Sequence, residues 1–200
     1  MDASDREKVK AWNIEILINN AAIGNSGPLA EIPIPRLAEV FETNVFAGPA
    51  LAQECIPYMK EPGSGKLIFV GSLEGLVGSS FLAPYSMTQY AVENLGTSLR
   101  QVLTPLGIDV TLINPGAYHT GIIQKNFAQK NEWSNAQGFY RAHLELLNAT
   151  EKKLTFFEEK STATIAKKIV KAVNAKNMKR RCLAPLFQSF AVKSLRRLVI

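Results

Sequence analysis

Cysteine is scarce in this sequence, in which Cys55 and Cys182 are the two cysteines among 200 residues. They are far apart and have no C-x-x-C partner, so neither a disulfide framework nor a zinc site has support. No uninterrupted apolar run approaches the roughly 18 residues that span a bilayer, and the N-terminal letters MDASDREKVK lack the pattern of a secretory signal. Secreted and membrane-spanning classes are therefore not expected, and a reducing cytoplasm is the simplest compartment.

Two other sparse features exclude further classes of protein. The two histidines, His119 and His143, have no cysteine or carboxylate companions at ligand spacing, so no metal site is expected. The letters PGSGK at residues 62–66 lack the earlier glycine and the following Ser or Thr of a P-loop. They predict a tight turn that leads into a strand.

Positive charge is concentrated near the C-terminus. Residues 1–149 contain 10 Lys or Arg and 14 Asp or Glu, whereas residues 150–200 contain 13 and 3, for a net charge of +6. Such a segment could attract nucleic acid or an anionic membrane surface. Aromatic residues are not interleaved with these charges as a base-stacking surface requires. We therefore expect a solvated face and no nucleic-acid partner.

Apolar patterning predicts a layered α/β domain. Short segments rich in Ile, Val, Leu or Phe at residues 14–20, 66–72 and 108–115 have the pattern of buried strands, and residues 181–185 form a weaker fourth. Helical periodicity marks residues 35–59, 84–103 and 165–173, and the apolar stripe of the second comprises Ala91, Leu95, Leu99 and Val102. Strands that alternate with such helices predict a parallel sheet with crossover helices, in one domain of residues 1–200.

A candidate site lies where these strands end. Ligands of such sheets bind beyond the carboxyl ends of the strands, which here are followed by residues 19–24, 71–76 and 115–120. Ser72 ends the second strand, and Tyr85 stands in the first turn of the next helix. A serine hydroxyl and a phenol that reach the same oxygen atom form a proton-transfer site for an alcohol or a carbonyl.

These residues resemble the short-chain dehydrogenase/reductase family, which comprises NAD(P)-dependent oxidoreductases on a Rossmann-type sheet. The letters NNAA at residues 19–22 resemble the family's Asn-Asn-Ala-Gly turn, and PGAYHT at residues 115–120 resembles its Pro-Gly-x-x-x-Thr loop. Ser72 precedes Tyr85 by thirteen positions, the spacing of the family's catalytic pair, and Asn44 stands where the family has its helix asparagine. MDASD resembles the segment whose first acid, here Asp2, approaches the adenine. The match runs from residue 2 to about residue 185.

The resemblance implies hydride transfer between NAD or NADP and the oxygen-bearing carbon of an alcohol, ketone or aldehyde. Tyr85 would exchange the proton, Ser72 would hold the substrate oxygen, and Asn44 would keep a water in the proton relay. The implied cofactor contacts are Asp2, Asn20, Ala21, Ala22, Pro115, Gly116 and Thr120.

Gln89 departs from the family pattern. The family has a lysine four residues after the tyrosine, where it hydrogen-bonds the nicotinamide ribose and lowers the tyrosine pKa. An amide can donate a hydrogen bond to a ribose hydroxyl, but it supplies no positive field. We therefore expect activity to be reduced by several powers of ten, in line with roughly 10²–10⁴ for a positioned acid or base.

The start of the sequence is the second departure. The family opens with a strand, a glycine-rich turn, a helix that receives the pyrophosphate, and a strand that ends at the ribose-selecting residue. This sequence begins at what resembles the end of the third strand, so the expected Rossmann-type fold lacks its first strands and the choice between NAD and NADP stays open. The exposed sheet edge predicts a partner, self-association or marginal stability. The family's dimer packs the helices at residues 35–59 and 84–103 against their mates, which implies a homodimer or homotetramer.

Residues 117–160 correspond to the family's substrate lid. Apolar residues gather there and suit an apolar substrate, although a helix pair packed on the core fits them about as well. They are Trp133, Phe139, Tyr140 and Leu144. His119 is expected to line the mouth of the cofactor or substrate site.

Residues 181–200 form a basic amphipathic segment. Phe187, Phe190, Ala191 and Leu198 lie on one stripe, with Arg196 and Arg197 opposite. We expect the stripe to dock on the domain, and weak peripheral contact with a membrane is the alternative.

Three functions remain open on the sequence. The first is a slow oxidoreductase of this family. The second is a non-catalytic relative that binds a partner or a nucleotide fragment. The third is a truncated gene product without an independent role.

Overall fold

A four-stranded parallel sheet forms the centre of the protein. The computed structural model describes residues 7–9, 11–128, 144–190 and 192. Within them the strands follow the order β1 (Ile16–Asn19), β2 (Gly65–Val70), β3 (Ile108–Pro115) and β4 (Arg181–Ala184), and each neighbouring pair is parallel. The predicted strands are therefore confirmed, including the weaker fourth, as is the parallel sheet with crossover helices.

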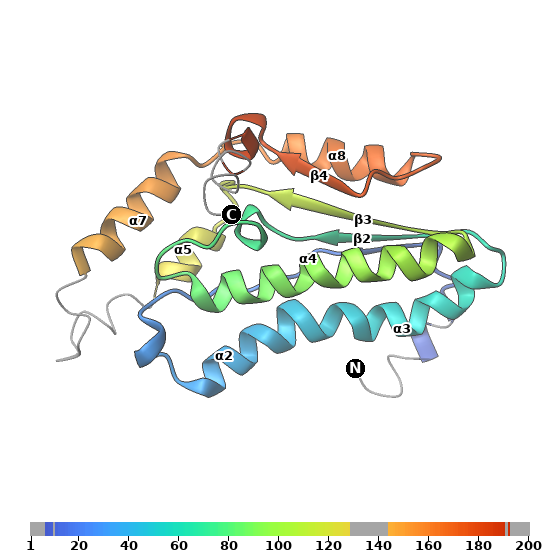
Figure 1. Ribbon diagram of the computed structural model, residues 1–200, viewed down its shortest axis with the longest axis horizontal. Coiled ribbons are helices and arrows are strands. Elements are labelled where there is room, and N and C mark those ends of the chain that lie inside the picture. Colours follow the sequence, from blue (N-terminus) through green and yellow to red (C-terminus); the bar gives the residue numbers. More distant parts are fainter. Residues whose placement is uncertain (1–6, 10, 129–143, 191, 193–200) are drawn as a thin grey trace.

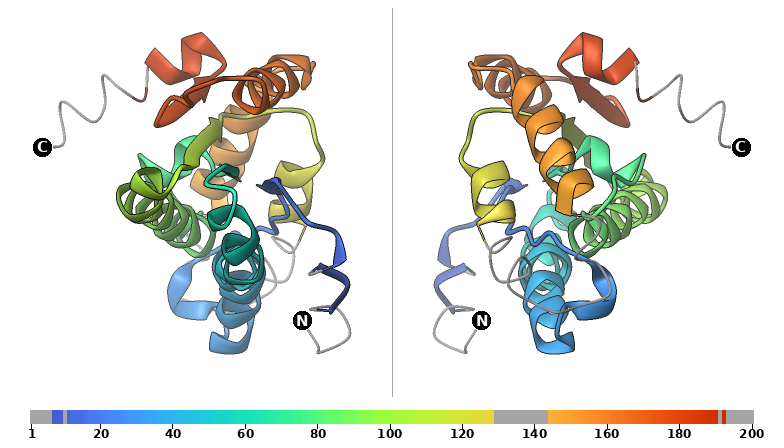
Figure 2. Two further views of the ribbon diagram at one scale, coloured as in Figure 1. Left: turned by 90° about the vertical axis from the view of Figure 1, so that its right-hand side faces the viewer. Right: turned by 90° about the vertical axis from the view of Figure 1, so that its left-hand side faces the viewer.

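Helices cover both faces of the sheet. On one face α2 (Ile34–Phe41) continues through a π-helical turn (Glu42–Phe46) into α3 (Ala47–Lys60), and α4 (Ala83–Leu103) runs beside them (Figure 1). On the other face lies α8 (Ala163–Val173) (Figure 2). Near the carboxyl ends of the strands, α5 (Ile122–Phe127) packs with α7 (Leu144–Phe156) around buried Leu82 and Leu147.

The alternation of side chains along β2 divides the core into two layers. Leu67 and Phe69 pack with the residues of α3 and α4, whereas Ile68 packs against α8. Successive side chains of a strand point to opposite faces, so a short apolar run supplies both layers at once. This explains why the strand pattern is continuous rather than alternating.

One prediction for α4 is wrong. Leu95 and Leu99 pack against the core as expected, but Val102 is exposed and Leu103 is buried instead. Leu103 stands eleven residues after buried Val92, which is close to three full turns of 3.6 residues, while position 102 falls about 80° off that line.

Strand β1 lies at one edge of the sheet. In the described part of the chain it pairs with β2 alone, and its Ile16 and Ile18 are exposed. The predicted exposed edge is thus present. Cys55 and Cys182 are both free thiols, so no disulfide links these two positions.

No helix among the described residues is long and apolar enough to cross a membrane.

Candidate active site

The carboxyl ends of β1, β2 and β3 bring the three predicted loops together. The backbone N–H of Gly71 donates to the carbonyl of Ile113 at 2.8 Å, and Asn114 Nδ2 donates to the carbonyl of Ser72 at 2.9 Å. The loop after β2 is therefore fixed to the end of β3. Residues that are remote in sequence converge here because the strands are parallel neighbours.

Ser72 and Tyr85 form the centre of the site. Ser72 follows β2 and caps a short 3-10 turn (Leu73–Gly75), since its Oγ accepts a hydrogen bond from the N–H of Glu74 at 3.1 Å. Tyr85 lies in the first turn of α4, where Pro84 suits the opening of a helix. Both residues are buried, and the Ser72 hydroxyl lies close enough to the Tyr85 phenol to influence its pKa. The thirteen-residue spacing thus places the two hydroxyls side by side.

Burial raises the pKa of Tyr85 to about 12. Loss of solvation is the main cause, the nearby Ser72 hydroxyl lowers the pKa, and the charge of Glu74 raises it further. At neutral pH only about one phenol in 10⁵ is then ionised. Tyr85 consequently holds its proton and is suited to donate it.

Gln89 lies one helical turn after Tyr85 and is 2% exposed. Its Oε1 has no hydrogen-bond partner, and neither has Oδ1 of Asn114. Both side chains flank Gly71, where an added Cβ would lie 3.7 Å from Gln89 Oε1 and 3.2 Å from Asn114 Nδ2. The position that follows the tyrosine by four residues therefore carries no charge and leaves an acceptor unsatisfied.

Glu74 is a carboxylate of the site that the sequence analysis missed. It accepts hydrogen bonds from the N–H of Ser79 at 3.0 Å, from Ser79 Oγ at 2.6 Å and from Ser86 Oγ at 2.8 Å. Burial nevertheless raises the pKa of this carboxyl above its ordinary value. Glu74 thus joins the loop after Ser72 to the first turn of α4. The sequence did contain a signal for Glu74 as a site residue, namely an acidic residue two positions after Ser72 that is followed by serines.

Asn44 connects a second pair of elements. Its π-helical turn directs the amide to residue 23, where Oδ1 accepts from the N–H of Ile23 at 2.8 Å and Nδ2 donates to the carbonyl of Ile23 at 2.7 Å. Nδ2 also lies 3.0 Å from Oγ1 of Thr88, which donates to the carbonyl of Tyr85 at 2.7 Å. Asn44 therefore holds the loop after β1 against the first turns of α4, through a residue, Thr88, that the sequence analysis did not select.

A buried charge pair lies next to the site on the β4 side. Glu93, two turns after Tyr85, pairs with Arg181 and accepts a hydrogen bond from Asn114 Nδ2 at 2.6 Å. Both members of the pair thus have partners. The charge of Glu93 is already compensated before any ligand binds.

The Pro115–Gly116 loop is fixed from the C-terminal side. The N–H of Ala117 donates to Gln188 Oε1 at 2.7 Å, and a Cβ on Gly116 would approach that oxygen to 1.9 Å. A larger residue at position 116 would have to displace the Gln188 amide. Thr120 is exposed, and the imidazole of His119 pairs with Glu158 at 3.0 Å.

The other predicted contacts are placed in part. Asn20 and Ala21 are exposed and Ala22 is half-buried, in the loop that follows β1. Several residues named from the sequence lie outside the described residues: Asp2, Trp133, Phe139, Tyr140, His143, Ala191, Arg196, Arg197 and Leu198. The described residues contain no group of three or more His, Cys, Asp or Glu that could hold a metal ion.

Comparison with known proteins decides the family. The model of the short chain dehydrogenase family matches residues 2–131. The chain belongs to the short-chain dehydrogenase family.

Two curated relatives are similar to this chain over part of their length. The oxidoreductase YusZ of Bacillus subtilis (strain 168) is 34% identical over 130 residues, which cover 61% of this chain and 46% of YusZ. Human 17-beta-hydroxysteroid dehydrogenase type 1 is also 34% identical over 130 residues, with 65% of this chain and 40% of the relative covered. The matched segment therefore spans less than half of either relative.

Two solved structures share the fold. A short-chain dehydrogenase from Streptomyces avermitilis gives a TM-score of 0.76 at 23% identity and covers 100% of this chain and 75% of that one. A short-chain dehydrogenase from Sphingobium yanoikuyae in complex with NADPH gives 0.69 at 20% identity, with 99% and 71% covered. The chain thus shares the Rossmann-like fold of both solved structures.

The described residues fit the nicotinamide half of the family's cofactor. Gln89 Oε1 and Asn114 Oδ1 are buried acceptors without donors, and hydroxyl groups of a bound ribose could supply donors near them. The half-buried Ala22 and the fixed Pro115–Gly116 loop stand at the same ends of the strands. For the adenine end the sequence offers Asp2, which lies outside the described residues.

Proposed function

We propose that the protein is an NAD(P)-dependent oxidoreductase that interconverts an alcohol and a carbonyl. The observation that carries this proposal is the buried Ser72–Tyr85 pair at the carboxyl ends of parallel strands, in a chain of the short-chain dehydrogenase family. The cofactor would supply or accept the hydride. The protein's own part is to hold the substrate oxygen and to move one proton.

Tyr85 and Ser72 divide that part between them. Ser72 donates a hydrogen bond to the carbonyl oxygen, and Tyr85 gives that oxygen its proton as negative charge develops on it. A phenol with a pKa of about 12 is fully protonated at neutral pH and is still a far stronger acid than an alcohol. This protonation state favours carbonyl reduction over alcohol oxidation.

Gln89 lowers the rate of either direction in this proposal. It is buried beside the site and brings no positive charge that would lower the pKa of Tyr85. Asn44 acts with Thr88 to set the position of the first turns of α4, and its water-holding role is part of the proposal. Asn20, Ala21, Ala22, Pro115, Gly116 and Thr120 are the proposed cofactor contacts, together with Asp2.

An apolar substrate and a homodimer complete the proposal. The human relative is named for a hydroxysteroid, an apolar alcohol, which supports the same substrate class here.

The homodimer is supported by an apolar surface on the helices. An open, mostly apolar hollow of about 530 Å³ lies between α2 and α4, and its lining includes Phe41, Met87 and Tyr90. Exposed Phe46 extends this apolar surface along the helices. A second copy packed on these helices would cover it.

Binding without turnover is the second candidate function. It is favoured by one observation, the uncharged Gln89 beside a tyrosine whose pKa is raised rather than lowered. In that case the fold would recognise a nucleotide or a partner and the Ser72–Tyr85 pair would be a remnant.

Calorimetric titration of the full chain with NADH and with NADPH tests the proposal. Saturable binding of either cofactor is expected, followed by slow reduction of apolar ketones and aldehydes that Tyr85→Phe abolishes. Tyr58→Phe is the matched control, because it removes a phenol hydroxyl from α3, which carries none of the proposed site residues. Binding with no turnover, in both the natural chain and Gln89→Lys, would favour the second candidate. The absence of any cofactor binding would refute the oxidoreductase and the recognition of a nicotinamide nucleotide.

A further inference from the structure

Five large apolar side chains form an exposed patch above the Pro115–Gly116 loop. They come from the end of α7 and from the helical residues 186–190 that follow β4 (Figure 1). Their exposed fractions are 82% for Phe156, 41% for Phe157, 83% for Leu186, 71% for Phe187 and 72% for Phe190. The rings touch: the centroids of Phe156 and Phe157 are 5.2 Å apart, edge to face, and those of Phe157 and Phe187 are 6.3 Å apart. We call these five residues the aromatic patch.

The short helix that contributes to the aromatic patch has its apolar side turned outward. Ser189 is buried and Gln188 is half-buried, whereas Leu186, Phe187 and Phe190 face away from the domain. The expectation that this stripe docks on the domain is therefore wrong for Phe187 and Phe190. The physical reason is that hydrogen bonds, not apolar contacts, attach the helix.

Gln188 supplies the main attachment. Its Nε2 donates to the carbonyl of Phe157 at 2.6 Å, and its Oε1 accepts from the N–H of Ala117 at 2.7 Å. The N–H of Glu159 also donates to the carbonyl of Ala117 at 2.9 Å. The aromatic patch is thus held in one place relative to the loop of the candidate active site. A contiguous apolar surface of this kind calls for an apolar partner.

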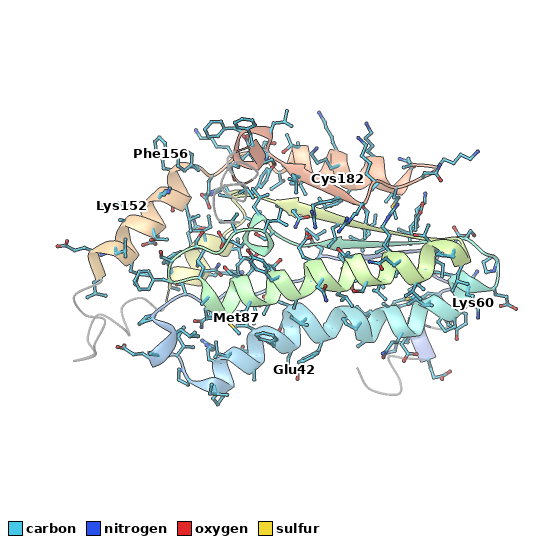
Figure 3. The ribbon with its side chains drawn as sticks, viewed as in Figure 1. Glu42, Lys60, Met87, Lys152, Phe156 and Cys182 are labelled. Atoms are coloured by element: carbon cyan, nitrogen blue, oxygen red, sulfur yellow. The ribbon has the colours of Figure 1, made fainter. Side chains whose placement is uncertain are left out.

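The charge around the aromatic patch indicates which partner. Lys152 and Lys153 are exposed, and each precedes a patch phenylalanine by four residues. Figure 3 shows Lys152 and Phe156 on α7. Lys160 is exposed just beyond it, while the side chain of Glu158 is 6% exposed and engaged by His119. Glu151 and Glu159, the other acidic residues in residues 150–200, are half-buried, so the exposed charges beside the patch are those of lysines. Aromatic side chains flanked by lysines match an anionic bilayer, in which rings enter the boundary of headgroups and acyl chains and ammonium groups meet phosphates.

A second copy of the chain fits the patch less well. An isologous contact would bring together two patches that each carry exposed lysines, and unpaired like charges across such an interface repel. Nucleic acid would use the rings singly as stacking platforms, whereas here Phe156 and Phe157 pack edge to face on each other.

We propose that the aromatic patch, with Lys152, Lys153 and Lys160, seats the domain on the surface of an anionic lipid bilayer. The Pro115–Gly116 loop then lies next to the membrane. An apolar substrate could reach the site from the bilayer, a consequence that rests on the proposed function. Binding to lipid itself needs no cofactor and no turnover, so its failure and that of the proposed function are separable.

Co-sedimentation of the full chain with vesicles tests this, using phosphatidylcholine alone and phosphatidylcholine mixed with phosphatidylserine. We expect binding to the anionic vesicles that weakens with added salt. Phe156→Ser combined with Phe187→Ser should abolish it, and Lys152→Gln and Lys153→Gln should each weaken it about fivefold. All four positions are exposed, and far-ultraviolet circular dichroism verifies the fold of each variant.

Two matched controls lie on other surfaces. Val170→Ser removes an exposed apolar side chain from α8, and Lys171→Gln removes an exposed charge from the same helix. Both should bind vesicles like the natural chain. Equal binding to neutral and anionic vesicles, full binding by the phenylalanine variant, or no vesicle binding would overturn the proposal. So would a patch-dependent dimer in light scattering, or displacement from vesicles by single-stranded DNA in a patch-dependent manner.

Discussion

Replacement of Gln89 with lysine would place an ammonium group one helical turn from the Tyr85 phenol. The natural side chain is 2% exposed and its Oε1 has no hydrogen-bond partner, so the substitution removes an unsatisfied acceptor and introduces a buried cation. Asn114 Oδ1 is also unsatisfied, and its side chain lies beside the same glycine, Gly71. Glu93 is already paired with Arg181, so it would compensate the new charge only in part.

The size of the effect follows from the spacing. Residues one turn apart on a helix are about 5–6 Å apart at Cβ. With an effective dielectric constant of about 20, a unit charge at that distance favours the phenolate by about 3 kcal/mol, or ~2 pKa units. We therefore expect the pKa of Tyr85 to fall from about 12 toward its ordinary value of 10. The ionised fraction at neutral pH would rise about a hundredfold.

The ultraviolet absorbance of the tyrosinate band measures this directly. The chain has five tyrosines, so the titration of Tyr85 is obtained by subtracting the same titration of a Tyr85→Phe variant in each background. Gln89→Met is the matched control, since it keeps the length of the side chain and adds no charge. If a cofactor binds, the pH profile of turnover should shift in the same direction.

One result would refute the reasoning. Gln89→Lys and Gln89→Met could both fold, as judged by circular dichroism, and yet show the same Tyr85 titration. The field of residue 89 would then not reach the phenol, and the reduced activity proposed for this chain would need another cause.

Three further predictions concern the same loop. Glu74→Gln should lower the pKa of Tyr85, because it removes a negative charge that raises that pKa. The same change should remove a pH dependence of stability: the raised pKa of Glu74 means that its contribution to the free energy of unfolding is full below about pH 4.5 and is lost as pH rises through the folded pKa. Urea denaturation at several pH values measures this dependence. Tyr85 should contribute about 3 kcal/mol of unfolding free energy that is present below pH 10 and lost between pH 10 and about 12, and Tyr85→Phe should abolish that loss in alkaline denaturation. Gly75→Ala should lower the free energy of unfolding by about 1–3 kcal/mol, since the new Cβ would lie 2.6 Å from the backbone carbonyl oxygen of Gln89. Gly78→Ala is the control, because the space around Gly78 is open and the denaturation midpoint should change little. Equal midpoints for the two variants would contradict the packing around Gly75.

Local pattern was sufficient for much of the fold. The apolar runs that became β2 and β3 and the period of α4 are properties of consecutive residues, and the backbone follows them because strands and helices bury fixed faces. The candidate pair Ser72 and Tyr85 was also found from the sequence, since a strand end and the next helix start are close in the chain. The end of α4 shows the precision of such reasoning: Leu95 and Leu99 pack on the core as predicted, but Leu103 rather than Val102 is buried at the end of the helix.

The sequence by itself determined the parallel α/β order, the resemblance to the family, and the absence of charge at Gln89. Only the tertiary structure decided the environment of those residues. The pKa of Tyr85 depends on burial and on Glu74, and Glu74 becomes part of the site because Ser79 and Ser86 are brought to it. The outward face of residues 186–190 depends likewise on Gln188, whose partners lie 31 and 71 positions earlier. Solvation and hydrogen bonds across such distances are set by the packed chain, so no local pattern of residues specifies them.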